Sequence, residues 1–440
     1  MPMPSAAYLK KIRPIQLIAI VFFTVSGGPY GLEPLLGYAG REGALLLVLI
    51  VPILWDVPAM LTVLELNSIM PVTGGYYRWV KFALGTKFGF YEGCWTWLYT
   101  FVDLAIYPVL FVQYAAFFYP ELINYKIPIC LVIIWASAGI NILGIVPVGR
   151  ISLFLSGLVL APFIILFAVA MYHHSGGLQI PAPSLKGVSL PSLGMGLYTI
   201  MWNCLGWDNT TTYAEEVDKP VRSYLISVFS AFALIMAIYF MTIWVAQLSG
   251  IDADTLAEEG FPAVGIIIGG QWLGILIAIG GMASTLGIYG AVLLSVSRVP
   301  HVMAEDGLLP KRINILHTRF QTPYISILIC SIVVSLMILW SFADLIIIDV
   351  IVYGAGLSLE YISLIRLRIK QPNIHRPFKI PLNVTGICLM LALPVAVYFI
   401  ALAGAFSLSA QTVKPAVFAI CALLSAEVAW RILNRIKFIK

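Results

Sequence analysis

Residues 15–37 read IQLIAIVFFTVSGGPYGLEPLLG, an apolar run that three glycines and a proline interrupt at residues 26–31. The interruption lies about 11 to 16 residues from the basic end of the run, which at about 1.5 Å per residue is close to the middle of a bilayer. Lipid cannot satisfy the backbone groups that Gly and Pro leave without helical partners. We therefore expect a broken helix whose open backbone is buried in protein or faces a wet cavity. A proline kink that serves only packing is the alternative, less favoured because one proline would be enough.

The composition excludes a water-soluble protein. The chain has 440 residues, of which 60% are hydrophobic and 11% charged, whereas about a quarter of a soluble chain is charged. Because one membrane-spanning helix needs roughly 20 apolar residues, the hydrophobic content is sufficient for about twelve of them. Soluble enzymes, nucleic-acid-binding proteins and disordered scaffolds are excluded, and we expect a single integral membrane domain over residues 1–440.

The distribution of basic residues tests the number of spans. With twelve spans and a cytoplasmic N-terminus, 22 of the 26 lysines and arginines fall in cytoplasmic segments, as the positive-inside rule requires. We therefore expect twelve transmembrane helices with both termini in the cytoplasm. Two segments exceed one crossing and are expected to tilt or to include interfacial turns, namely 88–118 and 262–294. The expected spans are 15–37, 43–66, 88–118, 127–143, 150–171, 193–214, 224–248, 262–294, 322–341, 344–365, 384–405 and 412–433.

A second interruption is expected in the sixth span, at WNCLGWDN (202–209), about ten residues from the outer edge and again near the midplane. Spans one and six are five apart and run in opposite directions, which is the pattern of a five-plus-five inverted repeat. We expect the first repeat, with the start of the second, over 15–214, the second repeat over 193–365, and two additional helices over 384–433. Transporters bind substrates at such paired interruptions.

Seven acidic residues are placed deep in the expected spans, and no lysine or arginine accompanies them at mid-span. Each costs roughly 2.5–3.5 kcal/mol at the bilayer centre, so such residues are functional candidates by default. We expect them to be protonated or to receive a cation from a travelling solute. An interfacial position is also open for Glu65 and Glu360, and a capping role for Asp349. The seven are Glu33, Asp56, Glu65, Asp103, Asp208, Asp349 and Glu360.

Span three places Asp103 one turn from Tyr99 and Tyr107 on one helix face, with Glu92 further along that face. A carboxylate between tyrosines can hold an ammonium group through charge pairing and cation–π contact. A polar seam between packed helices is the alternative. We favour the seam for Glu92 and the cation site for Asp103.

Glu33 falls in the first turn after the break in span one. The restarting helix presents unpaired N–H groups and the positive end of its dipole there, which would hold the carboxylate of an amino-acid substrate. An acid of the protein's own at this place disfavours an anionic substrate group and favours a purely cationic one. Ordinary compensation of the helix dipole is an equally open interpretation.

The chain resembles the amino acid–polyamine–organocation (APC) superfamily over nearly its full length, and within it the plant- and protozoan-type polyamine uptake transporters. The resemblance implies the LeuT-like inverted-repeat fold and secondary active transport by alternating access. It rests on GPYGLE (28–33), FVDLAIYPVLF (101–111), WNCLGWDN (202–209), EVDKP (216–220), SR (297–298), MAEDGLLP (303–310) and RPFKIP (376–381).

The resemblance also implies a substrate site between spans one, three, six, eight and ten. Tyr289 and Tyr353 are weaker members that could equally be packing aromatics. Span five reads LVLAP at 158–162 and lacks the lysine that replaces a sodium ion in some proton-coupled members, so Glu33, Asp103 and Asp208 are the candidates for proton coupling. The expected contacts are Ser26, Gly27, Gly28, Tyr30, Gly31, Glu33, Asp103, Tyr107, Trp202, Asn203, Trp207, Asp208, Tyr289 and Tyr353.

Taken together, the sequence predicts a multi-pass transporter of the cell membrane that carries polyamines or related organic cations, with protons as the favoured coupling ion. The alternative is an amino-acid permease, symporter or exchanger, that binds the substrate carboxylate at the first break. No enzyme motif of the HExxH, Walker or nucleophile-elbow type is present. We expect no enzymatic activity, no cofactor, no metal site and no nucleic-acid partner.

Overall fold

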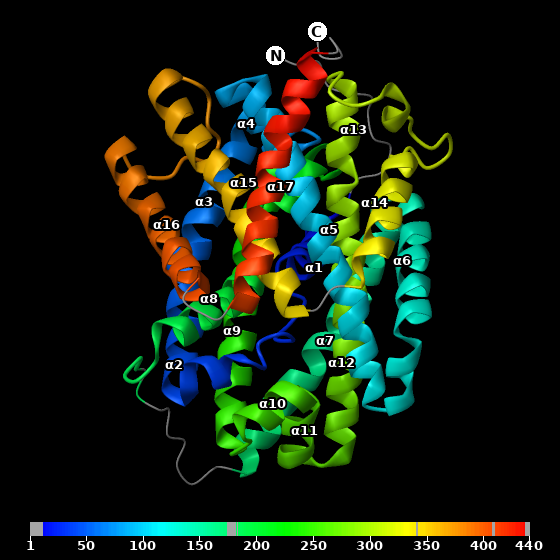
Figure 1. Ribbon diagram of the computed structural model, residues 1–440, viewed down its shortest axis with the longest axis vertical. Helices are drawn as coiled ribbons and strands as arrows, with labels where there is room; N and C mark the ends of the chain where they lie inside the picture. The colour runs from blue at the N-terminus through cyan, green and yellow to red at the C-terminus, as the bar shows by residue number, and fades with distance from the viewer. Residues whose placement is uncertain (1–11, 174–181, 183, 340–341, 407–409, 436–440) are drawn as a thin grey trace.

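The computed structural model describes residues 12–173, 182, 184–339, 342–406 and 410–435, and only the backbone of 342–346, 405–406 and 410–415. Within these ranges the protein is helical, and its β-contacts are limited to two isolated bridges. Figure 1 shows the helices as one bundle. They are α1 (Pro14–Val25), α2 (Leu35–Val51), α3 (Val57–Ile69), α4 (Gly75–Leu84), α5 (Thr86–Ala116), α6 (Lys126–Ile142), α7 (Ile145–His173), α8 (Leu190–Trp202), α9 (Pro220–Leu248), α10 (Ala253–Glu259), α11 (Phe261–Gly269), α12 (Gln271–Val296), α13 (Arg298–Glu305), α14 (Tyr324–Met337), α15 (Phe342–Lys370), α16 (Val384–Phe406) and α17 (Ala410–Arg435).

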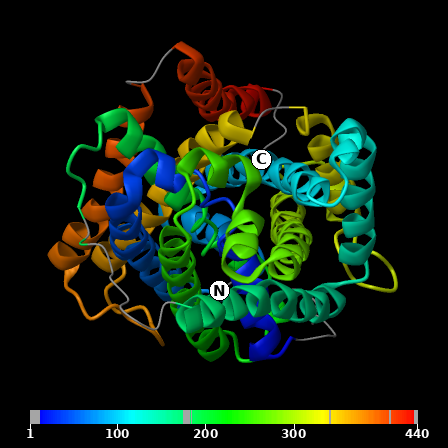
Figure 2. The ribbon, with the colours of Figure 1, turned by 90° about the horizontal axis from the view of Figure 1, so that it is seen from below.

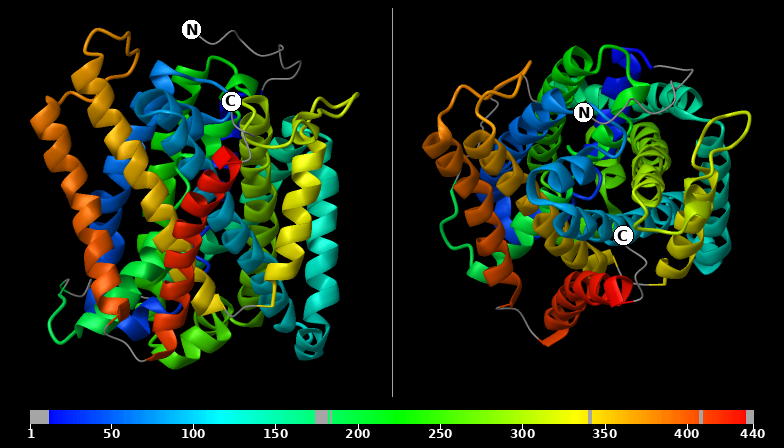
Figure 3. Two further views of the ribbon diagram at one scale, coloured as in Figure 1. Left: turned by 45° about the horizontal axis from the view of Figure 1, so that its top comes forward. Right: turned by 90° about the horizontal axis from the view of Figure 1, so that it is seen from above.

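The length and composition of these helices identify a multi-pass membrane protein. In the described part of the chain, nine helical segments are long and apolar enough to cross a membrane, and α1 and α14 are shorter apolar helices. Most of α15 is buried, whereas α16 and α17 are largely exposed and lie at the edge of the bundle (Figures 2 and 3). An exposed apolar surface of this kind is suited to lipid.

The first expected break is confirmed. Helix α1 ends at Val25 and α2 begins at Leu35, so 26–34 are not helical. Gly31 has a φ of 94° and Gly40, at a corner inside α2, a φ of 67°, a backbone region that only glycine adopts at little cost. Gly40 therefore divides α2 into a short first part of five residues and a longer second part.

The second expected break is also confirmed, and it is longer than the sequence suggested. Helix α8 ends at Trp202, and only 3₁₀ turns follow, at Asn209–Thr212 and Ala214–Glu216. A Cβ on Gly206 would lie 2.9 Å from the backbone oxygen of Thr24. The second break therefore packs against the last turn of α1 at a distance that admits only a glycine.

The two segments that were expected to exceed one crossing, 88–118 and 262–294, differ in the structure: one is a single helix and the other is divided. Helix α5 is continuous over 31 residues. The other segment turns at Gly270, which separates α11 from α12, so only α12 is a crossing and α11 packs with α10 at one end of the bundle (Figure 1). A glycine with a φ of 85° permits this sharp turn.

Helices α4 and α13 lie at the opposite end of the bundle from α10 and α11 (Figure 1). Asp306, directly after α13, accepts from Lys81 at 2.7 Å and from Arg78 at 2.8 Å, both on α4. Burial acts to raise the pKa of Asp306, but these hydrogen bonds and charges outweigh it and hold that pKa below its usual range. The ion pairs therefore stay charged at neutral pH and tie α4 to α13.

The expectation that Glu65 is protonated or receives a cation from a solute is wrong, because the protein supplies its counter-charge. Its side chain is fully buried, accepts from Arg368 at 2.5 Å and forms an ion pair with Arg376 at 3.2 Å. The Ile380 N–H adds a bond of 2.8 Å. Arg368, near the end of α15, and Arg376, just after it, thus neutralise this acid. The sequence did not predict this pairing, because no basic residue lies at mid-span.

We expect Glu65→Gln to destabilise the protein strongly, because it leaves the buried Arg368 guanidinium without a counter-charge. Breaking a buried pair in this way costs about 3–5 kcal/mol. The melting temperature of the detergent-solubilised protein checks the effect. Glu427→Gln is the matched control, since Glu427 pairs with the exposed Arg431 at 2.6 Å, and exposed pairs add little. Equal melting temperatures for the two variants would contradict the prediction.

Candidate substrate site

The first break satisfies much of its own open backbone. The Gly28 N–H donates to Ser26 Oγ at 3.0 Å, and the Gly31 N–H donates to Glu33 Oε2 at 2.5 Å. The Gly27 carbonyl accepts from Ser284 Oγ on α12 at 2.6 Å. The positive end of the restarting helix is therefore already covered by a carboxylate of the protein.

Glu33 connects three parts of the bundle. Its Oε1 accepts from the Tyr114 hydroxyl of α5 at 2.8 Å, its Oε2 binds the break, and the Phe261 N–H of α11 also lies within hydrogen-bonding reach. The side chain is 6% exposed. All of these donors are neutral, so they stabilise the carboxylate without cancelling its charge.

A cavity of about 560 Å³ lies beside Glu33. Gly31 and Tyr114 line it together with Glu258 and Glu259 from the end of α10. Three carboxylates on one cavity give it a negative potential. Glu33 thus accepts hydrogen bonds that hold the break in place and also contributes to the acidic lining of this cavity.

Asp103 lies in an aromatic cage on α5. The Tyr107 hydroxyl donates to Asp103 Oδ1 at 2.5 Å, and the Tyr107 ring stacks on Trp202 with centroids 6.3 Å apart. The Trp202 indole also lies within reach of the carboxylate. The structure therefore brings together Asp103, Tyr107 and the end of α8, as the sequence predicted.

Asp349 belongs to the same centre, and a capping role for it is wrong. Helix α15 begins at Phe342, nearly two turns earlier, and Asp349 is fully buried, with neither oxygen accepting a hydrogen bond. Its carboxylate is close enough to Asp103 for the two charges to interact. The signal in the sequence was an acid in mid-helix without a neighbouring base.

Asp208 lies in the second break and is held by Tyr353. The Tyr353 hydroxyl donates to Asp208 Oδ1 at 3.0 Å and accepts from the Gly206 N–H at 3.2 Å. The Tyr353 ring packs edge-on against Tyr99 of α5, with centroids 5.2 Å apart. Tyr353 therefore orients the acid and lines the site between α5 and α15.

Two further acids surround Asp208, and the sequence had assigned both to less important roles. Glu92 and Glu360 are almost fully buried, and both lie close enough to Asp208 to interact with its charge. Thr96 donates to one Glu92 oxygen at 3.2 Å, whereas no donor group outside the three acids binds Glu360. The position of Glu92 between α5 and α15 fits the polar seam that the sequence favoured for it, and the interfacial depth considered for Glu360 stays a prediction.

Several expected contacts point away from these acids. The Trp207 indole donates to Asp56 at 3.1 Å, in the π-helical turn Pro52–Asp56. The Tyr30 hydroxyl donates to the Ile277 carbonyl at 2.7 Å. Tyr289 lies beside Cys330 of α14. Their substrate-binding roles stay predictions, and each has a packing function in this arrangement.

The two breaks are joined by one hydroxyl group. Tyr239, on α9, lies 2.6 Å from Ser26 Oγ in the first break and 2.6 Å from the Asn203 carbonyl in the second. The Asn203 amide itself donates to the Thr199 carbonyl at 2.8 Å. The side-chain amide of Asn203 is thus used in a bond to Thr199, and its backbone carbonyl forms part of the link between the two breaks.

The acids of the centre lack a positive partner. In the described part of the chain, no lysine or arginine forms an ion pair with Glu33, Glu92, Asp103, Asp208, Asp349 or Glu360. Their hydrogen bonds come from tyrosines, a threonine and backbone N–H groups. Hydrogen-bonded and unbonded carboxylates therefore line one buried region whose charge is not balanced.

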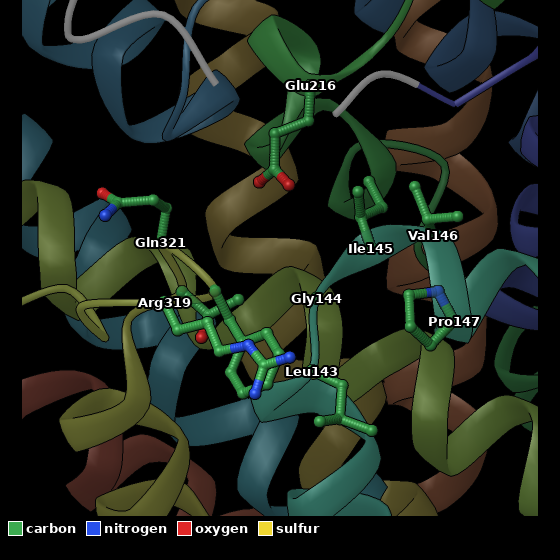
Figure 4. Close-up of a pocket in the computed structure, with 10 residues that line it drawn as sticks. Leu143, Gly144, Ile145, Val146, Pro147, Glu216, Arg319 and Gln321 are labelled. Atoms are coloured by element: carbon green, nitrogen blue, oxygen red, sulfur yellow. The ribbon is translucent and has the colours of Figure 1, made fainter. Parts of the chain in front are cut away.

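Two other cavities lie away from this region. A small one of about 70 Å³ is formed by the α6–α7 connection, with Glu216 and Arg319 on opposite sides (Figure 4). An apolar groove of about 370 Å³ lies between α6, α7 and α12. Neither contains an expected substrate contact. Within the described ranges, no three His, Cys, Asp or Glu side chains are grouped to hold a metal ion.

Comparison with known proteins identifies the family. Residues 12–424 match the amino acid permease family. The chain belongs to this family. The permease is 33% identical over 401 residues to a probable polyamine transporter of Arabidopsis thaliana, covering 89% of the permease and 81% of the relative. It is 31% identical over 412 residues to polyamine transporter PUT1 of Oryza sativa subsp. japonica, and the aligned region covers 91% of the permease and 75% of that relative. A cystine/glutamate transporter of Homo sapiens is 24% identical over 398 residues, with 86% and 78% covered.

Membership of this family makes the protein a transporter and not an enzyme. The described part of the permease is all-helical with several apolar helices long enough to cross a membrane, and its central acids come from α5, α15 and the two breaks.

We expect Gly31→Ala to destabilise the permease more than Gly40→Ala. Both glycines have a positive φ, which costs an alanine roughly 1–2 kcal/mol. A Cβ on Gly31 would also meet the Trp202 ring, whereas a Cβ on Gly40 would meet nothing within 4 Å. Melting temperatures of the two purified variants measure the difference. Equal losses would show that the contact with Trp202 is not tight.

Proposed function

We propose that the permease is a secondary transporter that carries polyamines or related organic cations by alternating access. One observation supports this proposal most directly: the Gly31 N–H, at the break where an amino-acid carboxylate would bind, is occupied by Glu33. An anionic substrate group would have to displace this carboxylate and would meet its repulsion. A cationic group meets attraction instead.

The chemistry of the centre favours ammonium groups. Asp103 and Asp349 offer two carboxylates, and Tyr107 and Trp202 offer aromatic faces beside them. Carboxylates pair with ammonium ions, and tyrosine and tryptophan rings attract them through cation–π contact. The names of the relatives from Arabidopsis thaliana and Oryza sativa agree with this substrate class.

The proposed topology has twelve crossings arranged as a five-plus-five inverted repeat with two further helices and both ends in the cytoplasm. The crossings are the nine long segments, α14, and the two broken helices that include α1 and α8. This topology puts α4 and α13 on the cytoplasmic side and α10 and α11 outside. The basic side chains of the α4–α13 end then agree with the positive-inside rule.

In this arrangement, the outward cavity beside Glu33, Glu258 and Glu259 receives the cation first. The cation then passes to Asp103 and Asp349, where it neutralises charges that otherwise oppose movement through a low-dielectric region. On the cytoplasmic side, the buried pair between Arg298 and Glu216 at 2.9 Å and the Asp306 pairs hold the site closed. Opening them releases the substrate inward.

Protons are the proposed coupling ion. Helix α7 carries no lysine at 158–162 to replace a sodium ion, so in a proton-coupled cycle a buried carboxylate is the better proton carrier. Glu33, Asp103 and Asp208 are the proposed carriers, and Asp208 has the direct link to the second break through Tyr353. The proposed location is the cell membrane, and the partners are the small cationic substrate, the bilayer and the proton.

An amino-acid permease remains the second candidate because the human cystine/glutamate transporter is also a relative. In that function, the substrate carboxylate would bind the first break and the amine would bind the backbone around Asn203. Glu33 would have to leave the Gly31 N–H. Competition between substrates separates the two candidates.

We expect the purified permease in proteoliposomes to take up labelled spermidine and putrescine, and an excess of leucine to leave this uptake unchanged. Asp103→Asn removes one central charge, and we expect it to raise the KM for spermidine about tenfold, equivalent to about 1.4 kcal/mol. Glu427→Gln, on the exposed end of α17, is the control for a lost charge outside the site. Competition by leucine but by no diamine would refute the cation proposal.

We expect an inward proton gradient to increase the initial rate of spermidine uptake, because an acidic exterior supplies the proton that enters with the substrate. Asp208→Asn cannot exchange this proton and should lose the dependence on external pH. The measurement is uptake at two external pH values with the internal pH fixed. An unchanged pH dependence in the variant would remove Asp208 from the coupling pathway, and uptake that follows a sodium gradient would contradict proton coupling.

A further inference from the structure

Helices α5 and α15 run in opposite directions and carry matching acids. Asp103 lies near Asp349, and Glu92 lies near Glu360. Between these two pairs, the rings of Tyr99 and Tyr353 are 5.2 Å apart. On each helix the two acids are eleven residues apart, which is about 16 Å at about 1.5 Å per residue. The interface therefore has an acidic pair at each end and an aromatic pair between them.

The pair formed by Glu92 and Glu360 is joined by Asp208 from the second break. All three side chains are at most 3% exposed. Glu360 lies within hydrogen-bonding reach of Asp208, but no donor group outside the three acids binds it, and one oxygen of Glu92 receives no hydrogen bond. Buried carboxylate oxygens normally have a donor, so the cluster lacks at least one hydrogen-bond donor.

A second observation in the same place also indicates a missing group. The Tyr76 hydroxyl, on α4, is fully buried and lies within reach of Thr96 but makes no well-aligned hydrogen bond, and it is close enough to all three acids to interact with them. A Cβ on Gly356 of α15 would lie 3.3 Å from Glu92, so the backbone of α15 approaches this carboxylate closely. A group with several N–H donors satisfies these oxygens together.

The comparison with Glu65 shows that the protein can neutralise a buried acid when no ligand is required. Arg368, two turns beyond Glu360 on α15, binds Glu65. No lysine or arginine of the described chain is paired with Glu92, Asp208 or Glu360. A metal ion is a poor match, since these residues do not form a metal-binding group. An ammonium group matches the charge and the open acceptors.

We propose that Glu92, Asp208 and Glu360 form an inner subsite for a second ammonium group of the substrate, whose first ammonium group lies at Asp103 and Asp349. This inference rests on the proposed function and adds a preference for substrate length. The rings of Tyr99 and Tyr353 line the path of the methylene chain between the subsites. A fully extended amine chain advances roughly 1.3 Å per bond, so spermine spans the two subsites and 1,4-diaminobutane reaches only one.

The test measures KM values for 1,4-diaminobutane and spermine in proteoliposomes. We expect the wild-type permease to prefer spermine. Glu360→Gln should raise the KM for spermine about tenfold and the KM for 1,4-diaminobutane much less, so the preference disappears. Asp349→Asn should raise both KM values, because every substrate uses that subsite.

Glu92→Gln is the second variant, used if Glu360→Gln does not fold, and melting temperatures identify folded variants. Glu427→Gln is the surface control and should keep the preference for spermine. Equal increases of both KM values in the folded inner variants would overturn the subsite, because a structural defect does not depend on substrate length. A wild-type permease that transports both amines with equal KM would also overturn it and leave the proposed function standing. Absence of any polyamine uptake by the wild type would contradict the proposed function itself.

Discussion

A peptide group released from a helix inside a membrane must find its partner within the protein, and the bond between the Gly31 N–H and Glu33 is the contact on which the centre depends. It covers the exposed end of the restarting helix with a negative charge. The same carboxylate binds Tyr114 of α5 and borders the cavity that Glu258 and Glu259 also line. The side chain of Glu33 thus satisfies the open backbone, connects two helices and contributes negative charge to the cavity.

The sequence predicted the features that local physical rules determine. The interruption at 26–31 followed from glycine and proline at mid-membrane depth, and the interruption near Asp208 followed from its corresponding position. The proximity of Asp103, Tyr107 and Trp202 could be expected from the helix face and from the family resemblance. The corner at Gly270 was less clear, because an apolar run on both sides of one glycine reads as a single long span.

What the sequence missed depends on contacts between distant segments. Glu65 and Glu360 looked alike along the chain, as acids near the end of a span, yet one meets two arginines and the other meets two acids. Only the antiparallel packing of α5 and α15 places Glu92 beside Glu360. No periodicity within one helix contains that information, so the charge balance of a buried acid requires the tertiary structure.

The hydroxyl of Tyr239 has a mechanical consequence. It contacts Ser26 in one break and the Asn203 carbonyl in the other, while α9 itself is an unbroken helix of 29 residues. A displacement of either half-helix therefore strains the same tyrosine. In the proposed alternating access, a movement of one interruption is therefore transmitted to the other through α9 and not only through the substrate.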